Sequence, residues 1–268
     1  FWVYGDLPLT IVKGTGVLLD RLAPPLDGSS WQSYGRNQLV GRALNGIFDL
    51  GTILLLFLTA RRLYKHHRVA LLAALLYSMA VLPIQHAHFW VVDNMTTFFV
   101  TFTLFWLARV YDSEGSGRVA DYMLAGLFFG MALATKVSVA TLAFVFAAVG
   151  ALKLYQGWRA EGRVSQPLVE GLILRLGLAT LFGILAFRIF QPYAFSGPLT
   201  IAPRWLDNIH TIQGQMTGEA DPPFGYQWAS RVRLLFPWKN MVLWGLGLPL
   251  GLAAWIGWAT AVWQLARR

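Results

Sequence analysis

The chain has 268 residues, of which 56% are hydrophobic and 13% are charged, and its formal net charge is +9. Soluble domains carry roughly a quarter charged residues, so this composition and the mean hydropathy of +0.51 place the chain in a membrane. The lack of cysteine excludes disulfides and thiolate metal sites, and basic residues that lie in short clusters between apolar runs indicate cytoplasmic loops rather than nucleic-acid binding.

The first 40 residues are predicted to form a loop on the outer, non-cytoplasmic face. Their segment LPLTIVKGTGVLLDRLAPP mixes apolar and polar residues like a helix that lies in the membrane interface, and Pro24 and Pro25 end it. The chain starts at Phe1 without the basic start and the small-residue cleavage site of a signal peptide. We therefore expect a fragment that opens within a loop.

Seven apolar stretches follow, and each is near the roughly 20 residues that cross about 30 Å of hydrocarbon. The run from residue 123 to 154 would be about 48 Å long as one helix. Because basic residues flank both of its ends, we predict a hairpin with Lys136 near the apex. Six spans then occupy residues 41–190, and a seventh with a basic cytoplasmic end occupies 241–268. The stretches are Gly41 to Thr59, Val69 to Ile84, Thr96 to Val110, Tyr122 to Thr135, Val137 to Leu154, Leu168 to Phe190 and Met241 to Gln264.

The basic residues divide the loops between two faces. All of the main clusters fall on one side in this arrangement, and the positive-inside rule makes that side cytoplasmic. The opposite face receives an outer loop at residues 191–240. Its segment APRWLDNIHTIQGQM predicts an amphipathic interfacial helix, with an apolar face formed by Trp205, Ile209, Ile212 and Met216. The predicted fold class is therefore all-α, a polytopic transmembrane helical protein.

Polar side chains at membrane depth cost about 2.5–3.5 kcal/mol for a central charge, so they mark candidate sites. In the first span Arg42, Asn45 and Asp49 share one helix stripe, where they form either a polar contact between helices or part of a site. Asp93 begins the third span, where a carboxylate caps the helix N-terminus and can also act in catalysis. Lys136 either extends its amine to the interface or binds a phosphate.

Two further groups lie on the predicted outer face. His86 and His88 precede Asp93, and His88 is a candidate metal ligand, although two histidines without a third ligand are weak evidence for a metal. The loop cations run against the positive-inside bias, and a bound anion such as a lipid phosphate explains them. We take Arg231 and Arg233 as candidate phosphate ligands. The full set of loop cations is Arg204, Arg231, Arg233 and Lys239.

Five segments in their order resemble a known family: YGDLPL, LVGRALNGIFDLGTILLLFLTARRLY, QHAHFWVVDNMTTFFVTFTLFWLAR, GLFFGMALATKVSVATL and QPYAF. They are similar to segments of bacterial phospholipid-carrier-dependent glycosyltransferases of the GT-C superfamily, relatives of the protein O-mannosyltransferases and the aminoarabinose transferases. The resemblance runs from Tyr4 to the WGLGLPLG stretch and rests on order and topology rather than on one motif. It implies a multi-span helical fold with an active site at the outer membrane face.

The resemblance also implies a reaction, the transfer of a sugar from a polyprenyl-phosphate-type carrier to an acceptor hydroxyl with inversion at the anomeric carbon. Asp93 matches the second acid of the family and is the candidate catalytic residue. Lys136 matches the position near the carrier phosphate, and Arg42 matches a basic position at the start of a span. The family's first acid, the general base, is expected before Phe1, and Asp6 is a poor substitute for it.

The implied partners are a lipid-linked sugar donor and membrane lipids, and the implied location is a prokaryotic inner (cytoplasmic) membrane. Other membrane subunits are a further class of partner, nucleic acid is not expected, and the need for a divalent metal stays open. The alternative to an enzyme is a non-catalytic subunit that keeps the fold and serves as a structural or lipid-binding part of a larger membrane complex. A transporter is disfavoured because no pair of broken spans marks a midplane site.

Overall fold

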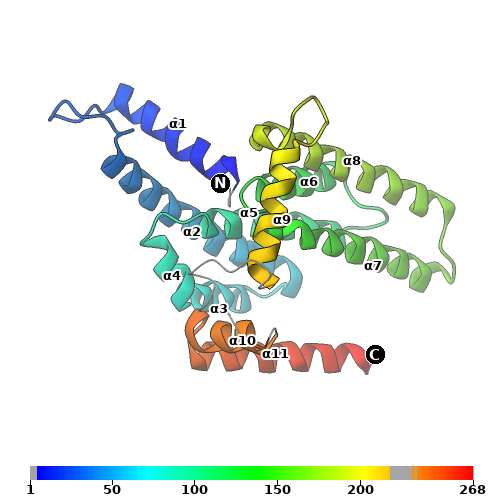
Figure 1. The fold of residues 1–268 in the computed structure, drawn as a ribbon. Helices are drawn as coiled ribbons and strands as arrows, with labels where there is room; N and C mark the ends of the chain where they lie inside the picture. Colours follow the sequence, from blue (N-terminus) through cyan, green and yellow to red (C-terminus); the bar gives the residue numbers. More distant parts are fainter. Residues whose placement is uncertain (1–4, 218–230, 233, 268) are drawn as a thin grey trace.

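Helices make up all of the regular structure in the computed structural model, which describes residues 5–217, 231–232 and 234–267 (Figure 1). The predicted all-α class is confirmed. Short 3-10 or π segments at Val137–Leu142, Pro192–Ala194 and Met241–Gly245 join some of the helices. The helices are α1 (Asp6–Leu22), α2 (Tyr34–Tyr64), α3 (His67–Ser78), α4 (Val81–Ala87), α5 (Asp93–Tyr111), α6 (Val119–Leu133), α7 (Ala143–Glu161), α8 (Gln166–Phe190), α9 (Pro203–Thr217), α10 (Leu235–Asn240) and α11 (Leu248–Ala266).

Three helical segments of the described chain are long and apolar enough to cross a membrane: α2, the continuous run Val137–Glu161, and α8. The pair α3 and α4 also qualifies if a bent pair counts as one span. The chain is therefore a membrane protein, and the count of seven spans stays a prediction.

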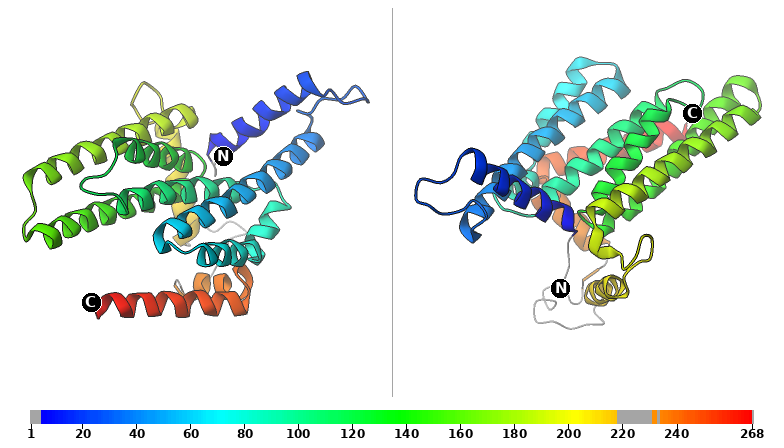
Figure 2. Two further views of the ribbon diagram at one scale, coloured as in Figure 1. Left: turned by 180° about the vertical axis from the view of Figure 1, so that it is seen from behind. Right: turned by 90° about the horizontal axis from the view of Figure 1, so that it is seen from above.

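The first loop contains the helix predicted for it. Pro8 lies in the first turn of α1, where its missing N–H costs no helical hydrogen bond, and α1 ends two residues before Pro24. The Asp20 carboxylate accepts hydrogen bonds from the Ser30 hydroxyl at 2.7 Å and the Trp31 backbone N–H at 2.7 Å. These bonds tie the loop back onto α1 and place α1 beside α2 (Figure 2).

The centre of the bundle is α5, which packs against α2 and α6. Its phenylalanines interleave with those of its neighbours: the rings of Phe102 and Phe128 stack with centroids 3.8 Å apart, and those of Phe48 and Phe98 meet edge-on at 5.0 Å. Phe99 is buried in the same cluster. The run of aromatic residues after Asp93 is thus explained by packing.

The contact of α6 with α8 depends on small residues. A Cβ atom at Gly126 would collide with the backbone of Ala179, and one at Gly130 would collide with the backbone of Gly183. Both helices therefore present small residues four positions apart, an arrangement that lets membrane helices approach closely. The spacing is visible in the sequence as Gly-Leu-Phe-Phe-Gly at residues 126–130.

The turn predicted at Lys136, within the run from residue 123 to 154, is confirmed by contacts at its two ends, and the crossing of a membrane by both arms stays a prediction. Lys136, between α6 and the following 3-10 segment, contacts Asp93 at the start of α5. Lys153 and Gln156 of α7 instead donate to backbone carbonyls just after or at the end of α5, on Ser113 and Tyr111. The chain therefore turns at Lys136 and returns. Because α5 has 19 residues, its two ends lie about 28 Å apart, close to one hydrocarbon thickness.

The predicted span from Val69 to Ile84 differs from the structure, which divides it into α3 and α4 with a 60° bend. Pro83 explains the break. A proline ring clashes with the carbonyl four residues earlier, here that of Met79, and α3 ends at the residue before Met79.

The last predicted span also begins irregularly. Met241–Gly245 is a π turn, Gly247 has a φ of +82°, and α11 starts only at Leu248. A positive φ favours glycine because an added Cβ would be strained there. The regular helix is therefore shorter than the predicted stretch at its beginning.

Candidate functional site

Asp93 and Lys136 form an ion pair at one end of the bundle. Asp93 is the first residue of α5, and Lys136 is the residue directly before the 3-10 segment. The Lys136 Nζ donates to the Asp93 Oδ1 at 2.9 Å, and the two side chains are 37% and 33% exposed. A solute can therefore reach both groups. The sequence predicted each residue separately, and the hairpin brings them together.

The cap predicted for Asp93 is not made at this helix end. The residue that precedes the helix is Val92, and α5 has no side-chain capping hydrogen bond. The carboxylate still lies in the first turn, where the positive end of the helix dipole favours it. Its described hydrogen-bonding partner is Lys136, so the pair rather than the cap accounts for the position of this acid.

The start of α1 closes one side of this region. The backbone N–H of Gly5 donates to the Thr135 carbonyl at 3.0 Å, and that of Leu7 donates to the Ala134 carbonyl at 3.3 Å. A Cβ at Gly5 would collide with Ala134, so only glycine allows this approach. Residues 5–7 and the turn before Lys136 therefore meet, although about 130 residues separate them.

Asp6 lies beside the same turn and is only 5% exposed. Burial raises the pKa of its carboxyl, and the backbone N–H of Tyr193 partly opposes the shift by hydrogen bonding to it. The Asp6 Oδ2 has no hydrogen-bond partner among the described residues. The Asp6 backbone N–H donates to Gln191 Oε1 at 2.5 Å, so the segment after α8 joins the site as well.

The polar stripe on α2 supports the neighbouring turn. The Arg42 Nε donates to the His88 carbonyl at 2.7 Å, and the Asn45 Nδ2 donates to the carbonyls of Phe89 and Val91 at 2.7 and 2.8 Å. The contact between helices that the sequence left open is made by Asp49, which accepts a hydrogen bond from the Tyr77 hydroxyl of α3 at 2.9 Å, whereas Arg42 and Asn45 contact the turn before α5. The exposed side of Arg42 also lines a groove of about 420 Å³ with Gln38, Phe89, Trp90 and Val91.

The predicted metal ligand His88 and the predicted phosphate ligands Arg231 and Arg233 are not shown in contact with Asp93 or Lys136 in the part of the chain that the structure describes. His88 Nδ1 lies 2.7 Å from the Ile84 carbonyl, and within the described ranges no three His, Asp or Glu side chains gather as a metal site would require. The Arg231 guanidinium stacks on the Phe236 ring at 3.8 Å from its centroid, and Arg233 lies outside the described residues. The metal and phosphate roles of these residues stay predictions.

Two residues of this region were missed by sequence reasoning. Gln191 is 3% exposed and Thr135 is fully buried. A glutamine directly after a span and a threonine directly before Lys136 are polar residues at span ends, which is the only local signal that either carries. Their roles depend on a contact with α1 that no spacing rule predicts.

Comparison with known proteins identifies the family. Residues 26–210 match the sequence profile named PMT, dolichyl-phosphate-mannose-protein mannosyltransferase. This chain belongs to that family. The matched range includes Arg42, Asp93 and Lys136, and the membership confirms the resemblance to GT-C glycosyltransferases.

Two bacterial relatives agree with this family. Over 127 residues the chain is 32% identical to undecaprenyl phosphate-alpha-4-amino-4-deoxy-L-arabinose arabinosyl transferase 2 of Pseudomonas fluorescens, covering 47% of this chain and 23% of the relative. Over 215 residues it is 30% identical to the undecaprenyl phosphate-alpha-4-amino-4-deoxy-L-arabinose arabinosyl transferase of Pseudomonas aeruginosa, covering 78% of this chain and 36% of the relative. The chain thus spans about a third or less of these relatives. No solved structure matches the chain significantly.

Proposed function

We propose that this chain carries part or all of the active site of a glycosyltransferase that moves a sugar from a polyprenyl-phosphate-type carrier to an acceptor hydroxyl with inversion. The observation that carries the proposal is the solvent-accessible ion pair of Asp93 and Lys136, whose charged groups lie 2.9 Å apart at one end of the bundle. Membership of the mannosyltransferase family and the arabinosyl transferase relatives support this reaction class.

The two side chains suit the two halves of a single displacement. The acceptor oxygen attacks the anomeric carbon and gives its proton to a carboxylate, here that of Asp93 in place of the first acid expected before Phe1, while the bond from that carbon to the phosphate oxygen breaks. The Lys136 ammonium group stabilises the negative charge that develops on the departing phosphate. Attack opposite to the leaving group inverts the anomeric carbon.

The ion pair implies that the carrier binds before the acceptor proton is transferred. While the carrier is absent, the Lys136 ammonium group holds the Asp93 carboxylate. An arriving phosphate competes for that ammonium group, because anionic phosphate oxygens accept strong charge-assisted hydrogen bonds. Carrier binding then leaves the Asp93 Oδ1 free to accept a proton. No step in this scheme passes through a metal.

The test is the substitution Asp93→Asn in the purified protein held in nanodiscs. Asparagine keeps the size of the side chain but removes its charge, so we expect sugar transfer to fall by on the order of 100-fold or more, the range of an acid–base contribution. The readout is release of polyprenyl phosphate from donors that carry mannose or 4-amino-4-deoxy-arabinose. Asp207→Asn, an exposed position on α9, is the matched control and should transfer like wild type.

Unchanged turnover in Asp93→Asn would refute the catalytic role. Wild-type protein that binds the carrier but transfers neither sugar would instead favour the non-catalytic, lipid-binding subunit. Thermal unfolding of each variant separates a loss of chemistry from a loss of folding.

A further inference from the structure

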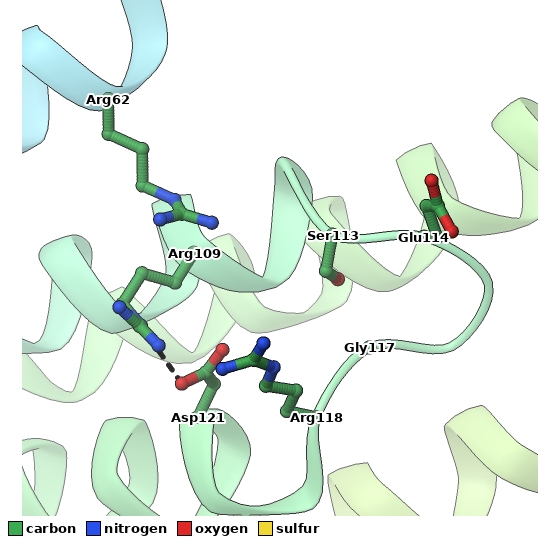
Figure 3. A pocket seen from close by; sticks show the side chains of 7 residues that line it. All are labelled: Arg62, Arg109, Ser113, Glu114, Gly117, Arg118 and Asp121. Carbon is green, nitrogen blue, oxygen red and sulfur yellow. Dashed lines mark hydrogen bonds and ion pairs between the residues drawn. The ribbon is translucent and has the colours of Figure 1, made fainter.

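A second polar cavity lies at the end of α5 opposite Asp93. It has a volume of about 480 Å³. Figure 3 shows the guanidinium groups of Arg62, Arg109 and Arg118 extending toward the same space from three different elements, with Glu114 turned away from them. The lining residues are Arg62, Arg109, Ser113, Glu114, Gly117, Arg118 and Asp121.

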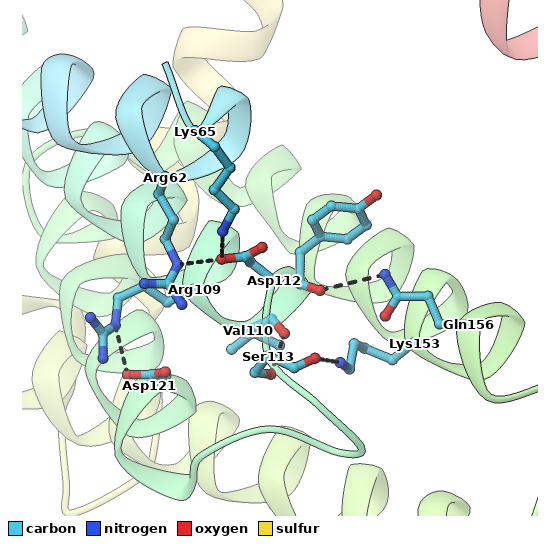
Figure 4. Close-up of polar contacts among 10 residues, drawn as sticks. Arg62, Lys65, Arg109, Val110, Asp112, Ser113, Asp121, Lys153 and Gln156 are labelled. Carbon is cyan, nitrogen blue, oxygen red and sulfur yellow. Dashed lines mark hydrogen bonds and ion pairs between the residues drawn. The ribbon is translucent and has the colours of Figure 1, made fainter. Parts of the chain in front are cut away.

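Neighbouring side chains hold the arginines in place but do not neutralise all of their positive charge. Arg109 donates to Asp121 at 2.9 Å and lies over the Trp106 ring at 4.9 Å. The Arg62 Nε is buried and lies 3.3 Å from the Asp112 carboxylate, yet has no hydrogen-bond partner among the described residues. Asp112 receives its hydrogen bond from Lys65 instead (Figure 4).

The charges around the cavity do not balance. Arg118 is exposed and forms no ion pair with any described residue. Lys153, only 2% exposed, donates to the Ser113 carbonyl and adds a further positive charge beneath the loop. The cluster therefore sets five cations against three carboxylates: Arg62, Lys65, Arg109, Arg118 and Lys153 against Asp112, Glu114 and Asp121.

Exposed aromatic residues indicate the depth of the cavity. Tyr64 adjoins Lys65, Tyr111 adjoins Asp112, and Tyr155 and Trp158 lie on the turns of α7 around Gln156; all four are 40–67% exposed. Tyrosine and tryptophan gather where a membrane meets water. The cavity consequently lies at the level of lipid headgroups.

We propose that this cavity binds the phosphate of an anionic phospholipid, such as phosphatidylglycerol, at the membrane face opposite the sugar-transfer site. Planar guanidinium groups match phosphate oxygens in pairs, and the Arg62 Nε, which pairs with Asp112 at 3.3 Å, makes no hydrogen bond within the described residues. A general bias of basic residues toward one face explains their number but not why three arginines from separate elements share one cavity. The lipid chains would pack against the exposed aromatic residues around the cavity, a contact that a free phosphate cannot make.

The test uses the purified protein and short-chain lipids, with binding followed by native mass spectrometry. Wild type should bind dioctanoyl phosphatidylglycerol more tightly than dioctanoyl phosphatidylcholine or inorganic phosphate. Arg118→Gln and Arg62→Gln should each weaken phosphatidylglycerol binding about fivefold, the factor that corresponds to ~1 kcal/mol per basic residue near an anionic surface. Arg118→Lys should retain only part of the binding, because it keeps the charge but loses the paired donors of the guanidinium group.

Arg163→Gln is the matched control, since Arg163 is an exposed arginine on the loop between α7 and α8, outside the cavity. An equal loss in this variant would show diffuse attraction and overturn the site. Equal affinity for inorganic phosphate would overturn the lipid assignment, and equal affinity for phosphatidylcholine would overturn the anionic preference. The test is independent of sugar transfer, because none of these residues belongs to the Asp93 region.

Discussion

At the scale of single residues, the chemistry of the candidate site depends on how Asp93 and Lys136 share their charges. Each side chain is about one third exposed, so their mutual attraction contributes at most ~1 kcal/mol to stability. Folding therefore does not require the pair. Their exposure leaves both groups available to a ligand.

Substitutions of Lys136 distinguish its two possible roles, extension of the amine to the membrane interface and binding of a phosphate. We expect Lys136→Ala to keep expression and thermal stability near wild type but to weaken carrier-lipid binding by about 1.5–3 kcal/mol, the scale of a charge-assisted hydrogen bond. Arginine should restore binding only in part, because its wider planar fork need not fit the place of a compact ammonium group. The measurement is a titration with polyprenyl phosphate in nanodiscs.

The same lipid without its phosphate provides the ligand control, and Lys13→Ala, at an exposed position on α1, provides the protein control. Wild-type affinity for the phosphorylated lipid in both Lys136 variants would mean that Lys136 does not contact the carrier.

Asp6 allows a prediction about pH because burial raises the pKa of its carboxyl. Well below pH 3.8, the carboxyl is protonated in the folded and the unfolded chain. As pH rises, the unfolded chain releases this proton first, so the stability contributed by Asp6 is lost toward neutral pH. We expect Asp6→Asn to unfold at a higher temperature than wild type at about pH 7, with the difference shrinking toward about pH 4.

Asp27 gives the opposite sign and serves as the control. Hydrogen bonds from Ser29, with the side chain of Arg36, lower the pKa of Asp27 to about 2. Its contribution is present above pH 3.8 and is lost as pH falls toward 2, so Asp27→Asn should destabilise the protein at neutral pH. A pH-independent difference for Asp6→Asn would contradict the account of Asp6.

At the scale of helices, close packing of α6 on α8 fixes the position of Lys136. The turn that carries Lys136 begins directly after α6, and α6 is held against α8 by glycine contacts with its backbone. Lipid tails are as apolar as leucine side chains, so close packing rather than water exclusion drives this association. A wider separation of the two helices would displace Lys136 from Asp93.

Adding one methyl group should reveal this dependence. Gly126→Ala or Gly130→Ala forces a Cβ into the backbone of α8, and we expect a loss of about 1–3 kcal/mol, the usual range for overpacking. Gly177→Ala lies on α8 with nothing within 4 Å, so it should be neutral or stabilising by up to ~1 kcal/mol through helix propensity. Thermal unfolding in detergent measures all three. Equal effects of the three substitutions would argue against the close contact.

At the scale of the whole molecule, the two ends of the bundle differ in chemistry. One end carries Asp6, Asp93 and Lys136, and the other carries the arginine cavity of Figure 3. The amphipathic helix predicted in the loop at residues 191–240 is present as α9. Its Trp205 ring lies 5.9 Å from the Phe187 ring, and its Ile209 and Ile212 are half-buried. Which end faces the cytoplasm follows from the positive-inside rule and stays a prediction.

Cysteine labelling tests that orientation, and the absence of native cysteine makes single-cysteine variants unambiguous. We expect Lys65→Cys and Arg159→Cys to react only with a reagent applied from the cytoplasm, and Asp207→Cys only with one applied from outside. The first two positions share an end of the bundle, since Lys65 contacts Asp112 and the neighbouring Gln156 contacts Tyr111. Labelling of positions 65 and 159 from opposite sides would refute the arrangement.

The sequence by itself determined the membrane environment, the all-α class, the hairpin at Lys136, the amphipathic helix at α9 and the family, because hydropathy, charge and segment order are local or additive properties. It also identified Asp93 and Lys136 as unusual, since a charge beside an apolar run is visible without a fold. It did not predict the bend before Pro83, where a steric clash within one turn outweighs a continuous apolar pattern.

Only the tertiary structure decided which of these residues meet. Asp93 and Lys136 are 43 positions apart, and Asp6 and Gln191 are 185 positions apart, so no spacing along one helix relates them. The same holds for Arg62, Arg109 and Arg118. In the sequence they are basic residues near the ends of apolar runs, and only the fold brings the three elements that carry them to one cavity. The physical reason is that close approach of helices depends on backbone contacts at Gly5, Gly126 and Gly130, and these contacts exist only once the partner helix is in place.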